Sequence, residues 1–187
     1  MKLSYLIRGF PGHPLHPPLT DATIGLYTGA LILAVLSLGD VAAEATTKGW
    51  WLLLIAGLVV GAATAVTGLA DWLTITRRTE LWWTATWHML AMVTATILFL
   101  LTAIFGHDDY VAGDLSGSSF VLTLIAFGAL TLGGWLGGSI VFVHGMRVLN
   151  LVDEPAHRAA APVPHPEKEA AAGERPSGGA DEAERPL

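Results

Sequence analysis

Four long apolar runs constrain this chain more than any other feature of its sequence. Three of them are about 20 residues long, which is enough for a helix to cross a hydrocarbon core of about 30 Å, and the first reaches that length if residues 19–23 are included. The runs do not alternate polar and apolar faces, as a surface helix of a soluble protein would. The sequence therefore predicts an all-α polytopic membrane protein, a bundle of four transmembrane helices. The runs are residues 24–38, 51–69, 84–105 and 120–143.

Composition divides the chain into three segments. We expect residues 1–19 to form an interfacial segment that ends in a His-Pro motif, and residues 20–150 to form the transmembrane domain. Residues 151–187 are rich in Ala, Pro, Glu and Gly and show no apolar periodicity. Such a sequence cannot bury enough surface to offset the entropy lost on ordering. We predict that this C-terminal tail is disordered and cytoplasmic.

The distribution of basic residues predicts the orientation of the helices. Loops that stay in the cytoplasm carry an excess of Lys and Arg, and here all but one of the basic residues near the runs fall on one side. We therefore expect both termini in the cytoplasm and the connections 39–49 and 106–118 outside. The residues on the cytoplasmic side are Lys2, Arg8, Arg77, Arg78 and Arg147, and Lys48 is on the other side.

Several function classes are excluded or disfavoured. The chain has no cysteine, so it has no disulfide, thiolate metal site, iron–sulfur cluster or cysteine nucleophile. Its formal net charge of −6 comes largely from the tail, and nothing indicates binding to nucleic acid. No Ser or Thr stands in a recognised nucleophile motif, so a hydrolase is the enzyme class that the sequence favours least.

Two histidines lie in a proline-rich segment just before the first apolar run. His13 and His16 each precede a proline, and a residue before proline is pushed out of the helical region of backbone conformation. We therefore expect both histidines in stiff, extended backbone, presenting their imidazoles at the membrane boundary. The alternative is that they are solvated side chains in an interfacial turn.

Four more ionisable residues fall at the ends of small-residue stripes in the predicted helices. Glycine at helical spacing lets helices approach closely, and residues three, four or seven apart share a face. We therefore expect Asp21, Asp71, His88 and His144 to point into the bundle near its cytoplasmic end, where an ionisable group usually serves a function. The stripes are Gly25 and Gly29; Gly57, Gly61, Ala65 and Gly68; Ala91 and Ala95; and Gly133, Gly134, Gly137 and Gly138.

These residues resemble the motifs of a bacterial membrane family, that of the domain of unknown function 2231, over residues 12 to about 150. The resemblance implies a four-helix protein of the bacterial inner membrane. Some members of that family are joined to a Rieske-type domain, which implies a redox setting for those members. The matching motifs are Gly12-His13-Pro14-Leu15-His16-Pro17, Thr20-Asp21 with Ile24-Gly25, Thr67-Gly68-Leu69-Ala70-Asp71-Trp72, His88, and Gly133-Gly134-Trp135-Leu136-Gly137-Gly138 with His144-Gly145.

Three functions remain open from the sequence. The first is a cofactor-binding protein of electron transfer, with His88 and His144 as ligands of a b-type haem. His13, His16, Asp71 and Asp21 would instead supply ligands for a transition metal such as zinc or iron. The second is a non-catalytic membrane module that packs against or assembles a partner complex. The third is a proton or ion pathway formed by an oligomer. The lipid bilayer is the expected environment, and a membrane redox partner or a second copy of the chain the expected partner.

Overall fold

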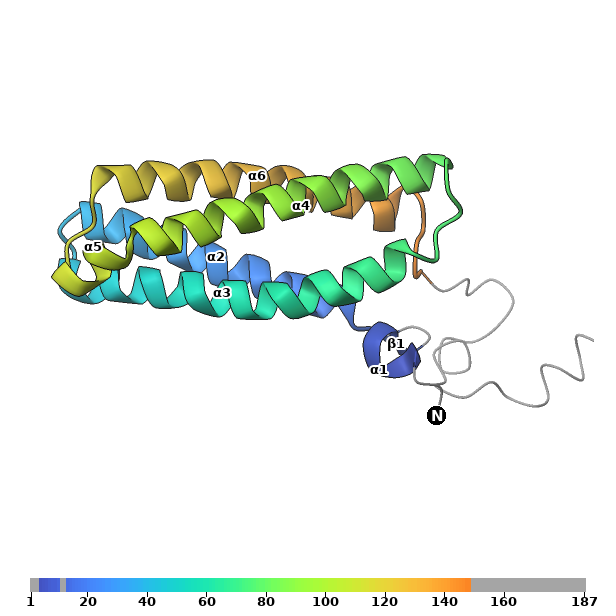
Figure 1. Cartoon of the computed structure of the whole chain (residues 1–187), viewed down its shortest axis with the longest axis horizontal. Helices are drawn as coiled ribbons and strands as arrows, with labels where there is room; N and C mark the ends of the chain where they lie inside the picture. Colours follow the sequence, from blue (N-terminus) through green and yellow to red (C-terminus); the bar gives the residue numbers. More distant parts are fainter. Residues whose placement is uncertain (1–3, 11–12, 149–187) are drawn as a thin grey trace, which may run out of the picture.

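The computed structural model describes residues 4–10 and 13–148, in which four long helices run side by side as an elongated bundle (Figure 1). They are α2 (His16–Leu38), α3 (Ala43–Trp72), α4 (Glu80–Phe105) and α6 (Gly117–Phe142). All four are long and apolar enough to cross a membrane, so the predicted architecture is confirmed. A short helix, α5 (His107–Ala112), joins α4 to α6. The predicted disordered tail, residues 151–187, lies outside the described residues.

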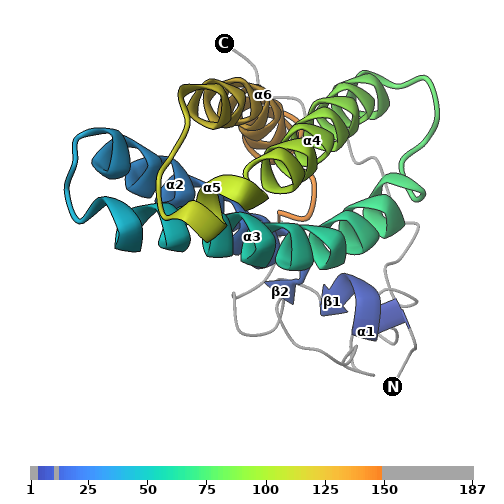
Figure 2. The ribbon, with the colours of Figure 1, turned by 60° about the vertical axis from the view of Figure 1, so that its left-hand side comes forward.

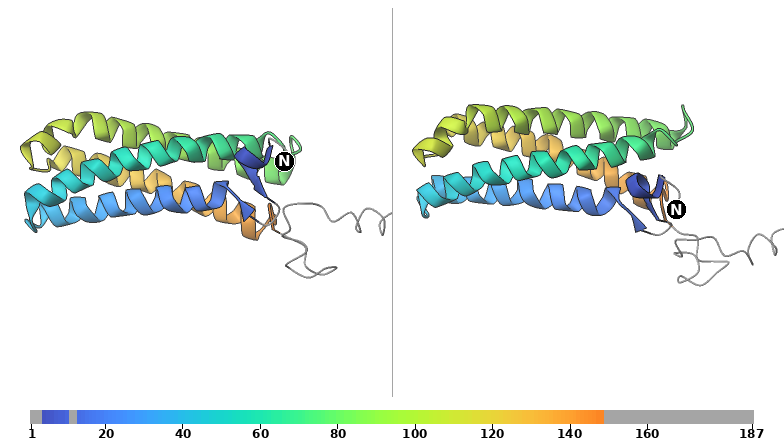
Figure 3. Two further views of the ribbon diagram at one scale, coloured as in Figure 1. Left: turned by 90° about the horizontal axis from the view of Figure 1, so that it is seen from below. Right: turned by 60° about the horizontal axis from the view of Figure 1, so that its bottom comes forward.

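The chain enters the bundle through three short elements. Helix α1 (Ser4–Arg8) is followed by the antiparallel pair β1 (Gly9–Phe10) and β2 (His13–Pro14), in which Phe10 faces His13. Gly9 has a positive φ of 76°, and a side chain there would strike the backbone of β2. These elements lie at the end of the bundle where α2 and α4 begin and where α3 and α6 end (Figure 3). We call this the polar end.

The structure corrects the predicted start of the first helix. α2 begins at His16, with prolines at its first helical positions, so the expectation of extended backbone at His16 was wrong. Proline fits the first turn of a helix because the N–H that it lacks would have no partner there. His13 does lie in extended backbone, in β2.

Two predicted connections also differ from the structure. α3 begins at Ala43, so the connection after α2 is residues 39–42 instead of 39–49, and the connection 106–118 contains α5. The first turns of α3 are polar, with an ion pair from Lys48 to Glu44 at 2.5 Å. A helix continues beyond the apolar run because its backbone hydrogen bonds do not depend on hydropathy.

The bundle consists of two tightly packed helix pairs. α2 packs most extensively on α3, and α4 on α6, whereas contacts between the pairs are fewer (Figure 2). The pairs meet through a stack of Tyr27 on Phe99, with ring centres 3.7 Å apart. They also meet through a hydrogen bond of 3.2 Å from the Trp50 ring N–H to the Thr123 hydroxyl. All four of these side chains are buried.

The small-residue stripes face inward only in part. Gly57 lies beneath the Tyr27 ring, and Gly68 and Gly137 lie beneath the imidazoles of His16 and His88. Gly25, by contrast, is exposed, and nothing would lie within 4 Å of a side chain there. Ala65 is exposed as well. Lipid is as apolar as a neighbouring helix, so small residues alone do not tell which face meets protein.

We expect Gly57→Ala and Gly25→Ala to have different effects on stability. A methyl group at position 57 would lie 2.6 Å from the Tyr27 ring, and such overpacking costs about 1–3 kcal/mol. The same change at position 25 meets open space, and alanine favours the helix by up to about 1 kcal/mol. Thermal unfolding in one detergent should therefore show a lower melting temperature for Gly57→Ala only. Identical melting curves for the two variants would contradict this packing.

Candidate functional site

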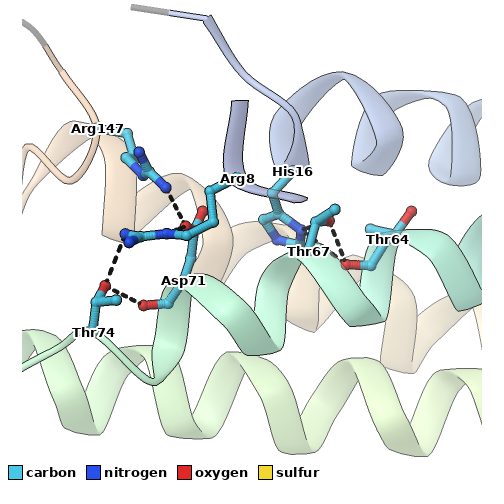
Figure 4. Close-up of polar contacts among 7 residues, drawn as sticks. All are labelled: Arg8, His16, Thr64, Thr67, Asp71, Thr74 and Arg147. Carbon is cyan, nitrogen blue, oxygen red and sulfur yellow. Dashed lines mark hydrogen bonds and ion pairs between the residues drawn. The ribbon is translucent and has the colours of Figure 1, made fainter. Parts of the chain in front are cut away.

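Asp71 anchors the polar end of the bundle. It lies near the end of α3, and only 6% of its surface is exposed. Its Oδ1 atom accepts a hydrogen bond of 3.0 Å from Nε of Arg8, in α1, and another from Arg147, which follows α6 (Figure 4). A buried carboxylate is costly unless it is paired in this way. One carboxylate thus ties together three segments that are far apart in the sequence.

Thr74 completes this ion-pair cluster. Its hydroxyl accepts a hydrogen bond of 3.1 Å from Arg8 and donates one of 2.7 Å to the backbone carbonyl of Asp71. Together with the two guanidinium groups on the Asp71 carboxylate, this contact fixes α1 and the segment after α6 to the end of α3. The sequence proposed Asp71 as a metal ligand, whereas the geometry gives it a role in holding the fold.

His16 lies inside the polar end, between α2 and α3. Its Nδ1 is 3.1 Å from the backbone carbonyl of Thr64 and 3.2 Å from the hydroxyl of Thr67. A carbonyl can only accept a hydrogen bond, so Nδ1 of His16 carries the proton. The other ring nitrogen, Nε2, has no hydrogen-bond partner among the described residues, and in the neutral ring it carries the lone pair.

His88 has the same arrangement in the other helix pair. Its Nδ1 donates a hydrogen bond of 2.7 Å to the backbone carbonyl of Gly133, in α6. Within the described part of the chain, its Nε2 also has no partner. In both histidines a backbone carbonyl therefore fixes the tautomer and leaves Nε2 as the basic nitrogen. Metal-ligating histidines in proteins are oriented by this kind of hydrogen bond.

The two imidazoles lie next to each other where the two helix pairs meet. Their ring centres are 6.4 Å apart, and the ring planes are nearly perpendicular, at 85°. His16 comes from α2 and His88 from α4. The structure therefore brings together His88, which was predicted as a haem ligand, and His16, which was predicted as a ligand of a transition metal.

The other candidate ligands lie elsewhere. His144 Nε2 is 3.1 Å from the hydroxyl of Thr84, which itself donates to the carbonyl of Glu80, so Nε2 of His144 carries the proton. His13 is exposed in β2, and Asp21 is exposed on α2 beside the outward-facing Gly25. The expectation that the small-residue stripe of the first helix carries Asp21 inward was therefore wrong. In residues 4–10 and 13–148 no three His, Asp or Glu side chains are grouped to hold a metal ion.

Sequence reasoning missed the roles of five residues of this region, which are Arg8, Thr64, Thr67, Thr74 and Arg147. Arg8 and Arg147 indicated only the membrane orientation, although an aspartate near the end of an apolar helix needs a basic partner if it is buried. Thr67 stood in a motif of the family resemblance, and the other two threonines gave no signal, because threonine commonly donates to its own backbone, as Thr64 does to Val60 at 2.9 Å. Only the structure shows that Thr64 and Thr67 contact His16.

Comparison with known proteins gives one match. A family model described as a predicted membrane protein, DUF2231, matches residues 12–150, which include all four long helices. No curated protein and no solved structure matches the chain.

The ion-pair cluster predicts a large effect of Asp71→Asn. Removing the carboxylate leaves two guanidinium groups without their partner, and breaking a buried pair costs about 3–5 kcal/mol. The Arg8 and Arg147 side chains are 30% and 27% exposed, so we expect a smaller loss of unfolding free energy, of about 2 kcal/mol.

Asp21→Asn is the matched control, because Asp21 is exposed and forms no ion pair with any described residue. Such a surface change should alter stability by less than about 0.5 kcal/mol. Thermal unfolding of both variants in the same detergent measures the difference. Equal stability of Asp71→Asn and the unchanged protein would show that the cluster does not hold the polar end together.

Proposed function

The chain belongs to the DUF2231 family of predicted membrane proteins, and we propose that it binds a metal centre through His16 and His88 in a membrane electron-transfer setting. The observation that carries this proposal is the common geometry of the two imidazoles. Each donates Nδ1–H to a backbone carbonyl, and each leaves Nε2 without a partner among the described residues. We therefore propose His16 as the second ligand beside His88, whereas the sequence had predicted His144.

The number of protein ligands favours haem iron over zinc. Zinc sites use three or four protein ligands, and the described residues hold no group of three. Haem iron needs only one or two axial ligands from the protein, because the porphyrin supplies the rest. When bound, such a group would supply one-electron redox chemistry, and the two histidines would hold and orient it.

One further observation fits a metal bound between the helix pairs. A metal bound by two imidazoles from opposite sides places their ring centres about 6 Å apart, since metal–histidine bonds are about 2.0–2.1 Å long, and the observed separation is 6.4 Å.

The proposal is tested by haem and metal binding to the full chain in detergent. The unchanged protein should bind added haemin, seen as a Soret band in its absorption spectrum, or contain a metal by elemental analysis after gentle purification. We expect His16→Ala and His88→Ala each to weaken binding by more than about 10–100-fold, the loss that even residues supporting a metal ligand typically show.

His13→Ala and His144→Ala are the matched controls, because one imidazole is exposed and the other is engaged by Thr84. Both should bind as the unchanged protein does. If the unchanged protein is natively stable but neither contains nor binds haem or a metal, the proposal fails. The non-catalytic packing module would then be the better description.

The proposed setting is the bacterial inner membrane, with the polar end facing the cytoplasm. Arg8, Arg77, Arg78 and Arg147 all lie near this end, and the positive-inside rule places such residues in the cytoplasm. An electron-transfer partner would reach the histidine pair most directly from that side.

Single cysteines can test this orientation because the chain has none of its own. We expect Val41→Cys, between α2 and α3, to react with a membrane-impermeant maleimide in intact cells. Thr76→Cys, between α3 and α4, should react only after the membrane is opened. Both positions are exposed. The reverse labelling pattern would invert the proposed topology.

A further inference from the structure

We infer that α2–α3 and α4–α6 are two copies of one helix pair, related by an internal two-fold axis along the bundle, and that His16 and His88 are equivalent axial ligands of one haem iron on this axis. The inference rests on the proposed function, and it adds the symmetry of the site and the type of coordination. Equivalence of the two histidines is visible in their contacts, their position in each pair and the burial pattern around them.

The two histidines share two contacts, and His16 has a third, 3.2 Å from its Nδ1 to the hydroxyl of Thr67, where the other pair has Leu136. His16 donates to the carbonyl of Thr64 and lies over Gly68, and His88 donates to the carbonyl of Gly133 and lies over Gly137. In both pairs the accepting carbonyl precedes the glycine by four residues, which is one helical turn. The histidine of each first helix therefore docks on the same one-turn element of the second helix.

The aromatic stack between the pairs repeats this relation. Tyr27 lies eleven residues after His16, and Phe99 lies eleven residues after His88. The two rings stack at 3.7 Å with an angle of only 4° between their planes. A residue near a two-fold axis meets its own equivalent across that axis, and both Tyr27 with Phe99 and His16 with His88 do so.

The buried positions of the two pairs also match when the two pairs are aligned along the sequence. When α2 and α4 are aligned so that His16 matches His88, each buried residue of α2 named below matches a buried residue of α4. When α3 and α6 are aligned so that Gly68 matches Gly137, the same is true of their buried residues. Contacts between the pairs agree, because α3 meets α4 as α6 meets α2. The buried equivalents are Thr23 and Ala95, Ala30 and Thr102, Trp50 and Ser119, Leu54 and Thr123, and Gly57 and Ala126.

Most equivalent residues differ between the two copies, so the identical ones are informative. Every buried equivalent named above differs between the copies, and Asp71, which anchors the polar end, corresponds to Ile140. The histidine and the glycine beneath it are, by contrast, identical in both. Other identical equivalents are apolar, such as Leu26 with Leu98 and Leu53 with Leu122, so the histidine is the identical residue that can bind a ligand, and a shared ligand would explain why both copies have it. Membrane proteins built from repeats commonly bind their ligands at the repeat interface.

Symmetry determines the chemistry that the site can perform. Two equivalent imidazoles on opposite sides of one haem iron fill both axial positions. No coordination position then remains for oxygen or a substrate, so the centre fits an electron carrier and does not fit an oxygen-activating enzyme. The ring-centre separation of 6.4 Å is that of two imidazoles on one metal.

The inference is tested on the full chain loaded with haemin, by absorption and electron paramagnetic resonance spectra. We expect a six-coordinate low-spin spectrum for the unchanged protein. His16→Ala and His88→Ala should each give a five-coordinate high-spin spectrum, since each variant keeps one of the two axial ligands. Added free imidazole should restore the low-spin spectrum of both variants, which shows that they are folded. His144→Ala should keep the spectrum of the unchanged protein.

Other outcomes overturn the inference in distinguishable ways. A high-spin spectrum of the unchanged protein, or a changed spectrum in only one of the two variants, would overturn the symmetric site and leave the proposed metal binding intact. A bound metal ion without haem would overturn the assignment to haem. If the unchanged protein binds neither haem nor a metal, both this inference and the proposed function fail.

Discussion

Contacts between a ring-bearing side chain of one helix and a glycine of the next are the interactions on which the rest of this structure depends. In lipid no hydrophobic force drives helices together, so they associate where small residues let them approach closely. Gly57 accepts the ring of Tyr27, and Gly68 and Gly137 accept the two imidazoles. These contacts hold each pair together and at the same time turn both histidines toward the gap between the pairs.

The ion-pair cluster and the two histidines of the proposed site are separate at the polar end. The ion-pair cluster of Asp71 with Arg8 and Arg147 engages the one buried carboxylate among the described residues and ties three segments together. The histidine pair has no such partner, and its Nδ1 atoms bond to neutral backbone carbonyls. The carboxylate that holds the polar end together is thus engaged by guanidinium groups, and the proposed ligand would be bound by the imidazoles, whose Nε2 atoms have no partner among the described residues.

The looser interface between the two helix pairs is where a ligand can act on the fold. Each pair is closely packed within itself, whereas the pairs meet mainly through long aromatic side chains. A group bound by His16 and His88 would link the two pairs and stabilise the folded state by mass action. The proposed ligand would therefore bind where the helices are in less extensive contact.

The sequence by itself determined the four helices, since the length of an apolar run and the need to satisfy every backbone group in lipid leave no other structure. It also predicted that Asp21, Asp71 and His88 point inward, which is correct for Asp71 and His88 and wrong for Asp21. Only the tertiary structure decided that His88 meets His16 and not His144, that Asp21 faces outward, and that the two pairs are copies. The physical reason is that the rotation of a helix about its axis follows from side-chain packing. In helices that are apolar on every side, composition does not reveal that rotation.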